Sequence, residues 1–161
     1  MSLYFEWIKS SGSYVPYGCK EPRLYFDQIK EPLHVPLDSL VEILMLEVTI
    51  DSAKERVWLD SKVNLKMETG ISSEYSILCE FSLWRNSTLL ATEKFALTNQ
   101  IGKEGKVKTL MISVGISCTD DLLPPGNYTY TLKVRRLEDV EENVSNFEVK
   151  DRGLNAVVFL Q

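Results

Sequence analysis

Apolar and polar side chains alternate along much of the sequence, most clearly in residues 57–67, VWLDSKVNLKM. One phase of this segment is apolar apart from Ser61, while the other holds Trp58 followed by four charged or amide side chains. Successive side chains of a β-strand point to opposite faces of a sheet, so the segment is predicted to be a strand with one face toward a core and one toward water. Turn-forming residues separate further alternating segments, at residues 75–83, 89–97, 110–118 and 128–134.

Two other segments are apolar in both phases. Residues 39–50, SLVEILMLEVTI, also fit helical spacing, but Ile43 and Leu46 interrupt the polar face and β-branched residues gather toward the end, which favours a strand. The second segment is residues 153–161, GLNAVVFLQ. Strands of this kind are expected to be buried on both faces, so the second should lie centrally in a sheet or beneath a subunit interface. The residues expected at an interface are Leu44, Leu46, Val157 and Phe159.

Prolines divide the chain into an arm and a domain. Four of the six prolines fall within residues 10–36, so residues 1–37 are predicted to form an extended N-terminal arm with at most a short strand at residues 24–26. Residues 38–161 are then a single domain. Within it, Pro124 and Pro125 cannot donate to a strand ladder, which predicts that a strand begins directly after them.

The predicted elements are about seven or eight strands, without a convincing helix that could connect parallel strands. This pattern predicts an all-β fold, a two-sheet antiparallel β-sandwich. A jelly roll of the tumour necrosis factor type fits the strand spacing best, and an immunoglobulin-like sandwich is the alternative. The 161 residues are enough to bury a sizeable core without a metal or disulfides.

Composition excludes several classes of protein. A net charge of −5 opposes binding to nucleic acid, which requires clustered Lys and Arg. Glu6 and Lys9 interrupt the apolar residues at the N-terminus, so we expect no signal peptide and no membrane span, and therefore synthesis in the cytoplasm. The three cysteines, Cys19, Cys79 and Cys118, are too widely spaced for a metal-binding pair.

The sequence offers little for catalysis. His34 is the single histidine, and phosphate-binding loops and the Gly-x-Ser-x-Gly motif of hydrolases are absent, so we expect neither an enzyme nor a cofactor. Asp120 and Asp121 could contribute oxygen ligands to a calcium ion. Two carboxylates fall short of the six to eight ligands that calcium takes, which makes this metal hypothesis a weak one.

Trp58 and Trp84 both occupy the polar phase of their predicted strands, where a wet sheet face ordinarily carries charge. If residues 57–67 and 75–84 formed a hairpin, the two indoles would lie opposite each other and could stack on a sugar ring or bury themselves against a second subunit. If the two strands lie in different sheets, this pair does not form.

The order of four segments, RVWLDSKVNLKM, YSILCEFSLWRNSTLLAT, LLPPGNYTYTLKV and RGLNAVVFLQ, resembles small jelly-roll proteins of spore-forming Firmicutes. Those proteins are in turn similar to tumour necrosis factor and to complement-type globular heads. The resemblance covers residues 38–161. It implies trimeric packing and a spore- or cell-surface role, and it transfers no catalytic residue.

Two functional hypotheses follow. The first is a non-catalytic structural module that assembles into a homo-oligomer, with a trimer favoured. The second is a lectin-like module that binds a carbohydrate or another ligand through Trp58, Trp84 and the loop at Asp120. Besides a second copy of the chain, a glycan and a surface-layer protein are the partners considered.

Overall fold

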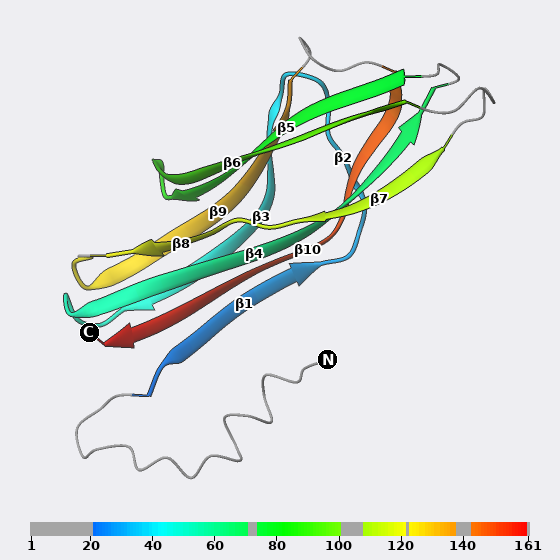
Figure 1. The fold of residues 1–161 in the computed structure, drawn as a ribbon. Helices are drawn as coiled ribbons and strands as arrows, with labels where there is room; N and C mark the ends of the chain where they lie inside the picture. The colour runs from blue at the N-terminus through cyan, green and yellow to red at the C-terminus, as the bar shows by residue number, and fades with distance from the viewer. Residues whose placement is uncertain (1–20, 71–73, 101–107, 122, 138–142, 161) are drawn as a thin grey trace.

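The structure is a computed structural model that describes residues 21–70, 74–100, 108–121, 123–137 and 143–160. These residues form ten strands and no helix (Figure 1). The strands are β1 (Arg23–Ile29), β2 (Leu33–His34), β3 (Leu40–Ile50), β4 (Glu55–Thr69), β5 (Glu74–Arg85), β6 (Thr88–Gln100), β7 (Thr109–Val114), β8 (Ser117–Asp120), β9 (Gly126–Arg136) and β10 (Val144–Leu160). No helix in the described part of the chain is long and apolar enough to cross a membrane.

The strands form two sheets, and every pair of strands is antiparallel. The six-stranded sheet has the order β1-β10-β4-β7, with β2 also paired to β10 and β8 to β4. The four-stranded sheet has the order β3-β9-β5-β6. Figure 1 shows β10 lying between β1 and β4. The predicted all-β sandwich of two antiparallel sheets is confirmed.

The pairing is nested along the chain. The first strand pairs with the last (β1 with β10), β3 pairs with β9, β4 with β7 and β8, and β5 with β6. This arrangement is a jelly roll. In an immunoglobulin-like sandwich the last two strands are neighbours in one sheet, whereas β9 and β10 lie in different sheets, so that alternative is wrong.

The core lies between the sheets and is formed by the inward phase of each strand. In β4 the predicted alternation is confirmed, because Val57, Leu59, Val63, Leu65 and Met67 are all buried. In β9, which begins directly after the two prolines as predicted, Tyr130, Leu132 and Val134 face inward.

The prediction that residues 39–50 are buried on both faces is wrong. β3 is an edge strand, and Met45 on its outer face is 50% exposed. A register shift between Glu42 and Leu44 makes consecutive side chains, Ile43 and Leu44, both buried. The apolar run therefore reflects a β-bulge, which places two neighbouring residues against the core. The central position predicted for the C-terminal strand is confirmed by β10.

The segment predicted as one strand at residues 110–118 is divided into β7 and β8. A Cβ atom on Gly115 would lie 2.6 Å from the carbonyl oxygen of Ser61, so only glycine fits at this position. The Ser61 hydroxyl donates to the carbonyl of Ile116 at 2.9 Å and accepts from its amide at 3.1 Å. These contacts satisfy the backbone where the ladder is interrupted.

Part of the predicted N-terminal arm belongs to the sandwich. The short strand expected at residues 24–26 is the seven-residue strand β1, which pairs with β10 from Arg23 to Ile29. β2 pairs with the same strand. Residues 1–20 of the predicted arm lie outside the described residues.

Candidate functional site

The outer face of the six-stranded sheet carries a row of apolar side chains. The register places Leu24 of β1 opposite Val157 of β10, and Val157 opposite Trp58 of β4. Leu24 is 50% exposed and Trp58 45% exposed, and Phe159, two residues beyond Val157, is partly exposed. We refer to Leu24, Trp58, Val157 and Phe159 as the apolar band.

The alternation of the three strands explains why the band faces outward. Directly paired residues of an antiparallel sheet project to the same face. Val57, Ala156 and Val158 are buried in the core, so their neighbours Trp58 and Val157 must project away from it. The band is therefore a consequence of placing apolar residues in both phases of three adjacent strands.

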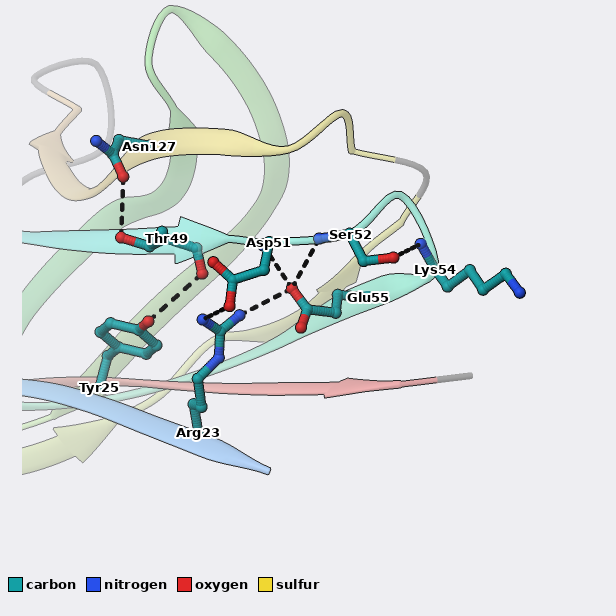
Figure 2. Close-up of polar contacts among 8 residues, drawn as sticks. All are labelled: Arg23, Tyr25, Thr49, Asp51, Ser52, Lys54, Glu55 and Asn127. Carbon is teal, nitrogen blue, oxygen red and sulfur yellow. Dashed lines mark hydrogen bonds and ion pairs between the residues drawn. The ribbon is translucent and has the colours of Figure 1, made fainter. Parts of the chain in front are cut away.

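A network of polar contacts holds the beginning of β1, and hence Leu24, in place (Figure 2). The guanidinium of Arg23 donates to Asp51 at 2.6 Å and to Glu55 at 2.8 Å. The same Glu55 oxygen accepts from the backbone amides of Asp51 at 2.7 Å and Ser52 at 3.3 Å, and Glu55 is only 3% exposed. The cluster fastens β1 to the turn between β3 and β4.

The Tyr25 hydroxyl extends these contacts by donating to the carbonyl of Thr49 at 3.4 Å, and the Thr49 hydroxyl donates to Asn127 at 2.9 Å (Figure 2). Three strands, β1, β3 and β9, are thereby joined next to the band. Charge-assisted hydrogen bonds to a buried carboxylate are among the stronger polar contacts in proteins. These contacts fix the position of the start of β1 relative to β3 and β9.

The predicted Trp58–Trp84 pair does not form. Trp58 lies on β4 in the six-stranded sheet, and Trp84 lies on β5 in the four-stranded sheet. The Trp84 indole donates to Ser82 at 2.8 Å, and the ammonium of Lys133 lies 5.2 Å from the centre of its ring. Trp84 is thus partly covered by its own chain, whereas Trp58 belongs to the apolar band.

A second row of side chains crosses the outer face of the four-stranded sheet, from Met45 through Thr131 and Trp84 to Leu89. Polar Thr131 interrupts this row, and Lys133 covers the indole. The apolar band has no such interruption between Leu24 and Trp58.

The residues predicted at a subunit interface fall into two groups. Leu44 and Leu46 are 2% and 7% exposed and belong to the core, so they are not available to a second subunit. Val157 and Phe159 lie on the outer face within the apolar band. Leu24 was not among the predicted interface residues, because the surrounding prolines suggested an extended arm. The run Leu24-Tyr25-Phe26 was the available signal, because a strand through it must place Leu24 and Phe26 on the face opposite to Tyr25.

Asp120 and Asp121 do not form a shared site. One carboxylate oxygen of buried Asp120 accepts from Arg85 at 2.6 Å, and the other accepts from the Tyr130 hydroxyl at 2.8 Å. Burial, followed by the hydrogen bond to Asp120, raises the pKa of Tyr130. Asp121 is on the surface and lies 3.3 Å from Arg56. In the part of the chain that the structure describes, no group of three or more His, Cys, Asp or Glu side chains could hold a metal ion.

No protein-family profile and no curated protein matches the sequence. Among solved structures, the chain is similar to VP2 of infectious bursal disease virus in a subviral particle, with a TM-score of 0.45 and 11% identity. It is also similar to the Gx strain of the same virus, with a TM-score of 0.42 and 12% identity. Each of these two likenesses covers 88% of this chain and 34% of the viral chain.

A third similar structure is dimeric latent PorU from Porphyromonas gingivalis, with a TM-score of 0.33, 15% identity and coverage of 87% of this chain and 13% of PorU. The chain spans about a third of the length of the viral chains it is similar to.

Proposed function

We propose that the protein is a non-catalytic structural module that self-associates through the apolar band on its six-stranded sheet. The observation that carries this proposal is the exposed row Leu24–Val157–Trp58, which crosses three adjacent strands. Contiguous exposed apolar surface on a sheet face is typical of protein interaction sites, and aromatic residues are enriched in their centres.

A second copy of the same chain is the partner that the proposal requires. Most soluble homo-oligomers are closed and symmetric, and a sheet face whose edge strand is held by polar contacts suits such packing. The contacts of Arg23 with Asp51 and Glu55 support this, because a preorganised surface loses little conformational entropy on binding. The resemblance to small jelly-roll proteins of spore-forming Firmicutes adds to the proposal that the oligomer is a trimer and that it acts at a spore or cell surface.

Size-exclusion chromatography with light scattering tests the proposal. The unaltered chain is expected to give an oligomer at micromolar concentration. Trp58→Glu and Leu24→Glu each place a charge in the band and should give monomers, because burying an unpaired carboxylate is costly. Met45→Glu is the matched control, since Met45 is equally exposed on the opposite sheet.

The unaltered chain eluting as a monomer would contradict the proposal. So would band variants that keep the mass of the unaltered oligomer. All three substitutions replace exposed side chains, so each variant is expected to fold. Circular dichroism of each variant checks that the sandwich is intact.

The lectin hypothesis in its original form requires a surface shared by Trp58 and Trp84. Their location on different sheets removes that surface. The loop carboxylate of Asp120 is also engaged by Arg85 and Tyr130. We therefore do not retain a tryptophan-pair sugar site in the proposal.

A further inference from the structure

A shallow groove of about 510 Å³ opens on the outer face of the six-stranded sheet, next to the apolar band. It lies over β1, β10 and β4, and its lining does not include any residue of the band. We propose that this groove is a binding site for a neutral saccharide. The proposal goes beyond self-association and does not depend on it.

Gly153 creates the hollow. It lies in the outward phase of β10, where Gln28 of β1 and Lys62 of β4 are its direct neighbours on either side. A Cβ atom here would meet only the Asp27 carbonyl oxygen, at an ordinary 3.8 Å, and the backbone does not occupy the left-handed region. The backbone therefore does not require glycine. Because glycine has no side chain, a hollow is left between the amide group of Gln28 and the ammonium group of Lys62.

Unengaged polar groups surround the hollow. Within the described ranges, the side chains of Gln28, Lys62 and Asn155 have no hydrogen-bond or ion-pair partner, and all three line the groove. An amide both donates and accepts, and an ammonium group donates. Hydroxyl groups, which also donate and accept, match this set.

The charges of the lining favour an uncharged ligand. Among the exposed charges of the lining, Asp27 and Asp151 face Lys30 and Lys62. The third lining cation, Arg152, is buried and donates to the backbone carbonyls of Ile43 and Glu31. The Asp27 carboxylate accepts from the backbone amide of Gln28 at 2.8 Å, and Asp151 accepts from the Asn64 amide at 3.4 Å. A phosphate or sulfate group would meet these two carboxylates as well as the two lysines, so the exposed charges give little preference for an anion.

Phe26 provides an apolar surface at the groove. Its ring lines the groove and is 68% exposed, which is the highest value among the large apolar side chains that the structure describes. Saccharides present flat apolar C–H faces together with hydroxyl edges. An exposed aromatic ring beside converging polar groups matches both features and is typical of a small-ligand site.

The test uses neutral oligosaccharides as probes: maltohexaose, cellohexaose, chitohexaose, xylohexaose and mannohexaose, each followed by isothermal titration calorimetry and by backbone amide shifts. At least one probe is expected to bind and to shift the amides of Gln28, Gly153 and Asn155. Failure of every probe at ~10 mM, where a complex with a Kd of about 1 mM would be nearly saturated, would overturn the proposal.

Substitutions at two positions, Gly153 and Phe26, test how the groove would bind its ligand. Gly153→Val fills the hollow and should weaken binding more than about 10-fold, with Gly153→Ala intermediate. Phe26→Ala should weaken binding about 3- to 10-fold through loss of the aromatic surface. Met111→Ala is the matched control, because Met111 is also exposed on this sheet and does not line the groove. Undiminished binding by the Gly153→Val protein would contradict the inference.

Two further readouts separate this inference from the proposed function. The mass of the Gly153→Val protein by light scattering should equal that of the unaltered chain; a change would assign the groove to the subunit interface and overturn the saccharide site. A titration with a sulfated oligosaccharide should give weaker binding than the best neutral probe. If only the sulfated probe binds, the neutral ligand class is wrong.

Discussion

Two buried arginines connect distant parts of the sandwich at the scale of single residues. Arg152 of β10 donates from its guanidinium to the carbonyls of Ile43 in β3 and Glu31 before β2. Arg136 of β9 donates to the carbonyl of Val35 at 2.7 Å and lies 5.0 Å from the ring centre of Phe147. The planar guanidinium group of each arginine donates hydrogen bonds to backbone carbonyl oxygens that lie outside the regular strand pairing.

Asp60 gives a prediction about pH. This carboxylate lies on the outer face of β4 between Trp58 and Lys62, and burial raises its pKa above the ordinary 3.8. The folded state therefore holds the proton more tightly than the unfolded state. The stability due to this group is fully present below pH 3.8 and is lost as the pH rises through the raised value.

Asp60→Asn should consequently be more stable than the unaltered protein at neutral pH, by roughly 0.5 kcal/mol for a partly exposed group. The gain should disappear at about pH 3, where the carboxylate is protonated in both states. Thermal unfolding at both pH values measures the difference. Glu93→Gln, the same change in charge at an exposed position, should show no gain at neutral pH.

At the scale of elements, β10 organises the six-stranded sheet, because it pairs with β1, β2 and β4. Its alternation predicts opposite effects at neighbouring positions. Ala156 is fully buried, so Ala156→Asp should cost more than about 3 kcal/mol of unfolding free energy and yield little soluble protein. Asn155→Ser, one residue away on the outer face, should change the free energy by less than about 0.5 kcal/mol. Urea unfolding measures both, and equal effects would contradict the register.

Side-chain alternation was sufficient to predict the faces of β4 and β9, because each of those strands has one wet face and no bulge in its apolar phase. The alternation gave the wrong faces for β3, where a bulge places both Ile43 and Leu44 against the core. A period-two pattern of side chains does not reveal such a bulge. It also failed at residues 110–118. The interruption there depends on Ser61, which is far away in the sequence.

At the scale of the molecule, the nested pairing explains why the candidate sites were only partly predictable. Every strand of the apolar band comes from a different part of the chain, and the register that brings Leu24 beside Val157 and Trp58 involves long-range pairing. The same topology separates Trp84 from Trp58. Local sequence patterns report the face of a strand, whereas the choice of partner strand depends on the whole fold.

The proposed assembly has a predictable response to salt. Each copy carries a net charge of −5, so copies repel one another, and the band itself is uncharged. Raising the ionic strength from about 0.05 M to about 0.5 M should leave self-association unchanged or strengthen it, because screening weakens the repulsion. Light scattering at both salt concentrations measures this, with the Leu24→Glu protein as a monomer reference. Dissociation at high salt would indicate an interface held by ion pairs instead.

The pairing of the first strand with the last places Arg23 directly opposite Val158. A polypeptide fused ahead of β1 and one fused after β10 would therefore both emerge beside the apolar band. A circular permutant that links residue 160 to residue 23 and opens at the turn between β5 and β6 would retain every ladder of the jelly roll.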